Sequence, residues 1–96
     1  MQELEKIEKI LKSYKKDLKK KYFVEKIGIF GSFSKGKETP KSDVDILVEF
    51  KGPIGWDFFE LKVYLEKIIG RDVDLVSVKA LKPQLKAKIL NEVIYI

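Results

Sequence analysis

The sequence predicts a small α/β (α+β) domain in which helices pack on a mixed β-sheet. Three observations lead to this fold class: apolar residues recur at helical spacing in the first 22 residues, three short apolar runs are typical of strands, and helical patterns follow the second and third runs. The resulting order is α-β-β-α-β-α, with a turn between the first two strands. With 96 residues the chain is expected to form one domain, residues 1–96, around one core.

The N-terminal helix is expected to span Met1–Tyr22. Its apolar residues lie three or four positions apart, so they line one face of the helix. Glutamates come early and lysines late, an order that suits the helix dipole. The late lysines are interpreted as a solvated face rather than as a patch that binds phosphates.

Strands are expected at Val24–Phe30, Asp43–Phe50 and Arg71–Val78. The second strand is apolar on both faces, because Leu47 lies on the same face as its acidic residues. A strand covered on both sides is typical of the centre of a sheet. The connection Gly31–Ser42 contains glycine, proline and many polar residues, and leaves room for one short helical turn at its start.

Two further helices are expected, over Trp56–Ile69 and Pro83–Leu90. A loop, Lys51–Gly55, precedes the first, and an apolar tail, Val93–Ile96, follows the second. Proline is well placed in a first helical turn. The apolar arc of the helix that starts at Trp56 is wider than one buried stripe needs, so this helix is either deeply buried or also meets a partner.

The composition limits the kinds of site that the chain can build. It contains no cysteine and no histidine, so a metal would be held by oxygen atoms, which favours Mg²⁺ or Mn²⁺ over zinc. No apolar run is long enough for a membrane span, and a cytoplasmic location without membrane contact is expected. The net charge of +5 suits polyanionic partners such as nucleotides. Direct nucleic-acid binding is not expected, because Arg71 is the only arginine.

The stretch from Gly31 to Glu49 carries the chemistry. Asp43 and Asp45 open the second strand, where residues two apart point to one face with Cα atoms roughly 6.5 Å apart. Two carboxylates placed in this way can bind one hard cation or two adjacent ones. Upstream, the Gly31-Ser32 turn offers backbone N–H groups and a hydroxyl to a phosphate. The combination indicates metal-assisted phosphoryl or nucleotidyl transfer.

A third carboxylate is needed near the attacking hydroxyl, to complete the second metal's shell or to accept a proton. Asp74 supplies it if the third strand lies beside the second. Asp72 shares its face and is the alternative. Asp74 is favoured because it lies inside the apolar run, where an unpaired carboxylate would be costly.

The spacing of Gly31-Ser32 and Ser42-Asp43-Val44-Asp45 resembles the signature of the DNA polymerase β-like nucleotidyltransferase superfamily. Because the chain is short and has no additional substrate domain, it is similar to the minimal nucleotidyltransferase (MNT) branch. The resemblance covers nearly the whole chain, including the strand around Asp74 and the closing Glu92–Tyr95. It implies the polymerase β palm-like nucleotidyltransferase fold.

Carried over by position, the resemblance implies that Asp43, Asp45 and Asp74 are the catalytic and metal-binding acids. It also implies a set of phosphate-binding residues: Gly31, Ser32, Lys35 and Ser42. ATP is the implied substrate, with two Mg²⁺ ions or Mn²⁺ in their place. Proteins of this branch pair with HEPN-domain toxins as antitoxins. The implied reaction transfers AMP from ATP to a tyrosine hydroxyl of the toxin and so inactivates it.

The sequence departs from the family pattern at one position. Many members carry a small residue, arginine and glycine after the Gly-Ser turn, where this chain has Ser34-Lys35-Gly36. Lysine keeps the charge but lacks the two-pronged hydrogen bonding of arginine. We therefore expect the same kind of catalysis, and its rate or substrate preference is the property that this substitution leaves open.

Two other functions fit the composition. A non-catalytic antitoxin would neutralise its partner by covering it, and would not need the acids. A small basic RNA-binding domain would bind RNA in a salt-sensitive, Mg²⁺-independent way. The absence of a basic strand interleaved with aromatic residues argues against the RNA-binding domain.

Overall fold

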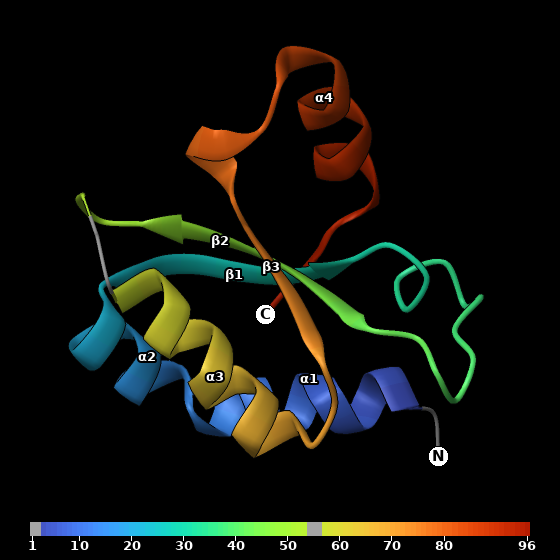
Figure 1. Cartoon of the computed structure of the whole chain (residues 1–96), viewed down its shortest axis with the longest axis horizontal. Coiled ribbons are helices and arrows are strands. Elements are labelled where there is room, and N and C mark those ends of the chain that lie inside the picture. The colour runs from blue at the N-terminus through green and yellow to red at the C-terminus, as the bar shows by residue number, and fades with distance from the viewer. Residues whose placement is uncertain (1–2, 54–56) are drawn as a thin grey trace.

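The computed structural model describes residues 3–53 and 57–96, and its centre is a four-stranded mixed sheet with the order β3-β2-β1-β4 (Figure 1). β1 (Val24–Phe30) pairs antiparallel with β2 (Val44–Phe50), and β2 pairs parallel with β3 (Val73–Ser77). β4 (Ile94–Tyr95) pairs antiparallel with the other edge of β1. The central position predicted for the second strand is confirmed.

Helices cover the two faces of the sheet unequally. α1 (Glu3–Ser13), α2 (Lys15–Tyr22) and α3 (Asp57–Ile69) lie on one face, and α4 (Pro83–Glu92) lies on the other (Figure 1). A 3₁₀ helix, Val78–Ala80, leads from β3 towards α4. Within residues 3–53 and 57–96, no helix has the length and apolar character that crossing a membrane requires.

The core lies between the sheet and the layer of α1, α2 and α3. Its side chains come from alternating strand positions, from one face of each helix and from one loop residue: Ile7, Leu11, Leu18, Val24, Ile27, Ile29, Phe33, Val44, Ile46, Val48, Leu61, Leu65, Val73 and Leu75. Each large side chain buried in this way stabilises the fold by about 1.5–3 kcal/mol. The opposite face of the strands is therefore left to the site.

The expected single N-terminal helix is wrong in one respect, because the chain breaks at Tyr14 into α1 and α2. Tyr14 has φ −100° and ψ 4°. The Ser13 hydroxyl donates to the carbonyl of Ile10 at 2.8 Å, a local side-chain bond that competes with the helical ladder and bends helices. The break lets both halves bury their apolar faces on a twisted sheet.

The C-terminal third differs from expectation at both ends of its strand, which ends at Ser77 instead of Val78, at the end of its helix and in its tail. β3 starts at Val73, so Asp72 precedes it, and α4 continues to Glu92 instead of ending at Leu90. The tail is a strand, because Ile94 and its neighbour pair with β1. A two-residue strand has too few residues for an alternating pattern, so only the open edge of β1 identifies it.

The wide apolar arc of α3 is used mainly for burial. Leu61 and Leu65 are fully buried, and four more side chains pack against the core: Phe58, Tyr64, Ile68 and Ile69. Phe59 and Val63 stay exposed. The expected first residue of this helix, Trp56, lies outside the described residues.

Candidate active site

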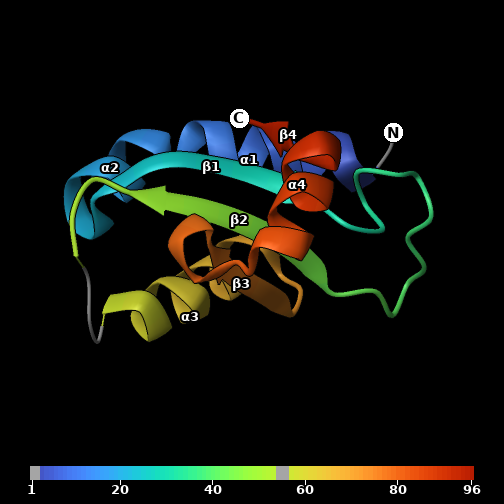
Figure 2. The same ribbon diagram turned by 90° about the horizontal axis from the view of Figure 1, so that it is seen from above.

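The sheet register brings two of the predicted acids together. β2 and β3 run parallel with Asp45 opposite Asp74, and their neighbours Val44 and Val73 point into the core. Since strand side chains alternate, both acids lie on the other face, the one that carries α4. Asp43 immediately precedes β2 and so ends the loop between β1 and β2. This loop projects beyond the end of the sheet (Figure 2).

Asp45 lies against the backbone of the Gly31 turn. Gly31 has φ +74°, and a Cβ built on it would collide with Oδ2 of Asp45 and lie 2.9 Å from its Cγ. A side chain at this position would therefore be strained and would displace the carboxylate. The glycine predicted to let phosphate approach also makes room for the central acid.

The surroundings of Asp45 disfavour its ionised form. The pKa of its carboxyl is raised from 3.8 to about 6, first by burial and then by the negative charge of Asp74 and a side-chain hydrogen bond to it. The charges of Asp43 and Glu92 act in the same direction. A raised pKa that depends on several neighbouring acids is typical of a functional site, and here it creates a place that favours positive charge.

This pKa shift predicts that Asp45→Asn stabilises the metal-free protein at neutral pH. Because the folded pKa lies above the unfolded one, the stabilising contribution of the acid is complete below pH 4 and is lost as the pH rises through 6. At pH 7.5 the variant is expected to have an unfolding free energy about 1 kcal/mol higher than the wild type, since solvent screens part of the repulsion. This corresponds to a rise of roughly 4–8 °C in Tm. Thermal melts in EDTA between pH 4 and pH 8 measure it.

Asp72→Asn is the matched control, because Asp72 is exposed and lies just before β3. At pH 7.5 it should not reproduce the rise in Tm that is expected of Asp45→Asn. An equal Tm of Asp45→Asn and wild-type protein at pH 7.5 would contradict the charge repulsion inferred at Asp45.

The donor chemistry of the acids fits Mg²⁺ or Mn²⁺, since the whole chain lacks histidine and cysteine and the ligands are carboxylates. The geometric expectation holds only in part. In residues 3–53 and 57–96, no group of three acidic side chains is close enough together to hold a metal ion. Asp45 and Asp74 meet, whereas Asp43 acts on Asp45 through its charge.

Register rather than burial distinguishes Asp74 from Asp72. Asp74 is exposed, so the argument from its burial is wrong. It contacts Asp45 because it lies opposite it in a parallel ladder. Asp72 instead lies opposite the start of β2, where its carbonyl accepts the N–H of Val44 at 2.9 Å.

The turn that follows β1 is closed by its own backbone. The Lys35 N–H donates to the Gly31 carbonyl at 3.2 Å, the Lys37 N–H donates to the Ser32 carbonyl at 2.9 Å, and the Ser34 hydroxyl donates to Gly31 at 2.9 Å. The short helical turn expected here is confirmed. Phe33, only 1% exposed, points from the turn into the core and fixes its position.

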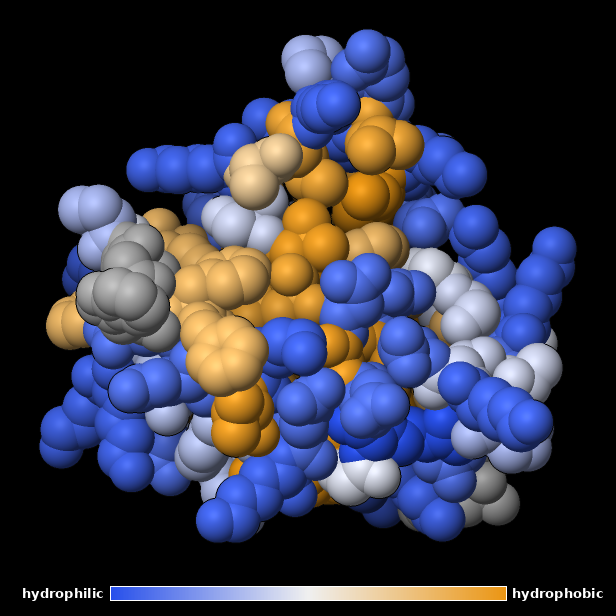
Figure 3. Space-filling view, viewed as in Figure 1, coloured by the Kyte–Doolittle hydropathy of each residue, from blue (hydrophilic) through white to orange (hydrophobic). Residues whose placement is uncertain are grey.

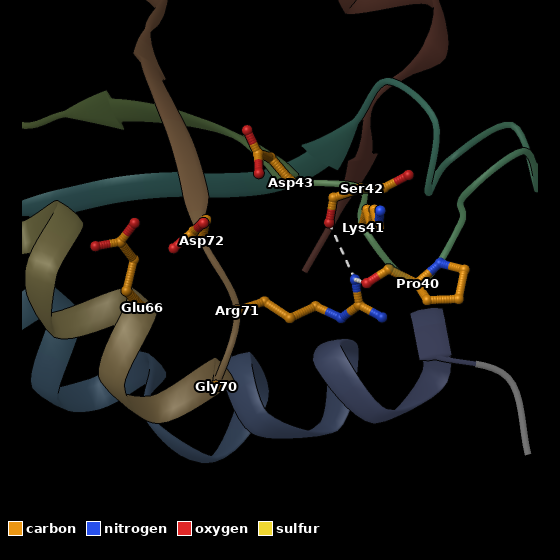
Figure 4. Close-up of a pocket in the computed structure, with 8 residues that line it drawn as sticks. All are labelled: Pro40, Lys41, Ser42, Asp43, Glu66, Gly70, Arg71 and Asp72. Atoms are coloured by element: carbon orange, nitrogen blue, oxygen red, sulfur yellow. Dashed lines mark hydrogen bonds between the residues drawn. The ribbon is translucent and has the colours of Figure 1, made fainter.

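The sole arginine holds the far end of the same loop. Arg71 Nη1 donates to the carbonyl of Ser42 at 3.0 Å (Figure 4). Its guanidinium lies 5.2 Å from the ring centre of Phe33. The Ser42 hydroxyl accepts the N–H of Thr39 at 2.8 Å. Phosphate binding by Ser42 stays a prediction, since its hydroxyl here closes the loop.

Figure 4 shows a cleft beside Asp43, in which Glu66 and Asp72 lie on one side and Arg71 crosses below. Glu66 accepts the N–H of Val73 at 3.0 Å and thereby ties α3 to the start of β3. The cleft adjoins the acids at one point, Asp43, and its residues mainly fix the strand ends that carry them.

Sequence reasoning missed Phe33, Arg71 and Glu92 as parts of the site. Glu92 accepts the N–H of Gly31, 61 positions away along the chain, and pairs with Lys35. The one available signal was the resemblance of the closing Glu92–Tyr95 to the family's C-terminal end.

Comparison with known proteins agrees with this geometry. The sequence profile of the nucleotidyltransferase domain family matches residues 4–96. This chain belongs to that family. Protein adenylyltransferase MntA of Thermococcus cleftensis is 45% identical over 94 residues, which cover 97% of this chain and 95% of MntA.

Two solved structures share the fold of this nucleotidyltransferase domain. One, assigned to the minimal nucleotidyltransferases, matches with a TM-score of 0.81 at 33% identity and covers 95% of this chain and 93% of that one. The other, a toxin–antitoxin crystal structure with AMP-PNP, has a TM-score of 0.70 at 26% identity, and the match covers 96% of this chain and 70% of that one. The predicted membership of the minimal nucleotidyltransferases and the predicted fold are confirmed.

Proposed function

We propose that this nucleotidyltransferase is a protein adenylyltransferase and antitoxin, which transfers AMP from ATP to a tyrosine hydroxyl of a HEPN-domain toxin and so inactivates it. The observation that carries the proposal is the contact of Asp45 and Asp74 beside the Gly31 turn. The name of the similar MntA protein and the AMP-PNP in a similar toxin–antitoxin structure support it. A cytoplasmic location belongs to the same proposal.

In the proposed reaction, the tyrosine oxygen bonds to the α-phosphorus of ATP. The bond from that phosphorus to the oxygen that leads to the β-phosphate breaks, and pyrophosphate leaves. The tyrosine proton passes to Asp74, which is suited to accept it because it is exposed on an edge strand and open to a partner's side chain.

Asp43, Asp45 and Asp74 would hold Mg²⁺, or Mn²⁺ in its place. Such ions supply neutralisation of the triphosphate charge and of the leaving pyrophosphate. The N–H and hydroxyl of Ser32 would bind phosphate oxygens, and Lys35 would add positive charge to the same end of the site. The conformation of Gly31 lets the phosphates approach the backbone.

The acceptor has to approach from the face that carries α4, because α1, α2 and α3 cover the other face (Figure 1). α4 has no buried residue, and Leu85 and Leu90 are exposed on it. Figure 3 shows apolar side chains at the surface below α4, surrounded by charged ones. We therefore place toxin docking at α4. The exposed Phe59 and Val63 belong to α3, a helix that covers the opposite face of the sheet from α4.

The test uses the chain with a HEPN-domain protein and ATP labelled at the α- or the γ-phosphate. AMP transfer predicts that label from the α-position, and not from the γ-position, appears on the partner when Mg²⁺ is present. Mass spectrometry should place AMP on a tyrosine. EDTA should abolish labelling, and Mn²⁺ should restore it.

Cell growth separates this proposal from a non-catalytic antitoxin. If a variant with Asp43→Ala and Asp45→Ala neutralises the toxin as well as the wild type, and the toxin carries no AMP, the chain acts by covering its partner. Loss of neutralisation together with loss of AMP on the toxin supports transfer.

A further inference from the structure

We propose that Glu92, the last residue of α4, is a positioning residue of the active site that fixes the phosphate-binding turn from both ends. The inference deepens the proposed function and rests on it for its kinetic test.

The register of the sheet sets Glu92 opposite Gly31. β1 pairs with β4 through Gly28 opposite Tyr95 and Ile29 opposite Ile94. Continued by two residues, the same register reaches Gly31 and Glu92. Glu92 is still helical, and its side chain takes the place of a ladder partner: Oε1 accepts the Gly31 N–H at 3.2 Å. A backbone donor at the sheet end is thereby satisfied.

The second oxygen of the same carboxylate contacts the other end of the turn. Oε2 of Glu92 lies 3.2 Å from Nζ of Lys35, and the Glu92 side chain is only 17% exposed. The Lys35 N–H in turn donates to the Gly31 carbonyl. One carboxylate thus joins the first and fifth residues of the turn. The Lys35 side chain is 41% exposed, so the ion pair is sheltered from solvent only on its Glu92 side.

This arrangement divides the donors of the turn between protein and ligand. Because Glu92 takes the Gly31 N–H, the N–H and hydroxyl of Ser32 are left for a phosphate. Because Asp45 packs against Gly31, a shift of the turn would also shift the central acid. The C-terminal segment therefore controls the distance between the phosphate-binding turn and Asp45.

The test compares Glu92→Ala with Glu92→Gln and with Asn91→Ala, an exposed neighbour that serves as the matched control. Glutamine keeps an oxygen for the Gly31 N–H but loses the charge that holds Lys35. Alanine loses both contacts. Three readouts are measured: kcat and KM for AMP transfer, the Kd of AMP-PNP, and hydrogen exchange of the Gly31 amide.

Glu92→Ala is expected to lower kcat/KM about 10–100-fold, because a partly buried donor loses its acceptor. Glu92→Gln should raise KM and Kd severalfold with kcat nearly unchanged, because Lys35 is no longer held in place. Lys35→Met should raise KM and Kd at least as much, since it also removes the charge proposed to act on the phosphates, and the double variant Glu92→Gln/Lys35→Met should not exceed Lys35→Met. Exchange at Gly31 should accelerate in Glu92→Ala alone.

The inference is overturned if Glu92→Ala matches Asn91→Ala in kinetics and in Gly31 exchange, even if its Tm falls, since the residue would then be structural only. If Glu92→Ala does not fold, additive effects of Glu92→Gln and Lys35→Met overturn it, and non-additive effects support it. If the wild type binds AMP-PNP but transfers no AMP, the proposed function fails, and the Kd and exchange comparison still decides the role of Glu92.

Discussion

Asp45→Ala is expected to slow AMP transfer on the order of a thousand-fold while the protein remains folded. Asp45 lies at the centre of the site, where it contacts Asp74 and packs against Gly31. Burial and the surrounding acids raise the pKa of its carboxyl to about 6. Removal of its carboxylate would take away one of the three acids that would hold the cations. Single-turnover kinetics with labelled ATP and the toxin measure the loss.

Glu49→Ala is the matched control, because Glu49 lies on the same strand and the same face, four residues further along and roughly 13 Å away. It should transfer AMP within about twofold of the wild type. Thermal melts show whether each variant is folded. A folded Asp45→Ala variant that transfers AMP at the rate of Glu49→Ala would remove Asp45 from the catalytic set.

Phe33→Ala is expected to cost about 3–5 kcal/mol of unfolding free energy, a large share of the 5–15 kcal/mol typical of a domain. Phe33 lies in a turn, yet it is 1% exposed and packs in the core beneath the sheet. Its removal leaves a cavity and frees the turn that carries Gly31 and Lys35. Urea titration followed by circular dichroism measures the change.

Phe59→Ala removes the same side chain from α3, where it is 65% exposed, and should cost less than about 0.5 kcal/mol. Phe33→Leu, which keeps most of the volume, should lie between the two alanine variants. Equal midpoints for Phe33→Ala and Phe59→Ala would contradict the packing inferred for the turn.

The elements that sequence predicted well are those with a strong local signal. β1, β2 and α3 follow from their apolar periodicity, and the central place of β2 follows from Leu47 on its otherwise polar face. The break at Tyr14 and the strand β4 were not predictable. The hydrogen bond from the Ser13 hydroxyl to the Ile10 carbonyl accompanies the helix break, and the open edge of β1 makes the tail a strand. Neither feature produces a periodic pattern in the sequence.

The candidate site divides in the same way. Four of the predicted site residues lie close together in the sequence: Gly31, Ser32, Asp43 and Asp45. Their spacing alone therefore predicts phosphate and metal binding. The sequence indicates Asp74 as the third acid of the site, but the burial expected for its side chain is wrong, because the side chain is exposed. Its contact with Asp45 depends on the parallel register of β2 and β3.

By itself, the sequence determined the kind of chemistry: with no histidine or cysteine, only oxygen ligands are available, and two aspartates after a Gly-Ser turn suit nucleotidyl transfer. Only the tertiary structure decided how the turn is held. Phe33 enters the core, Arg71 binds the loop end, and Glu92 reaches Gly31 from the last helix. Local spacing determines which groups are offered to a ligand. Contacts between residues distant in the chain depend on sheet register and packing, which local sequence does not encode.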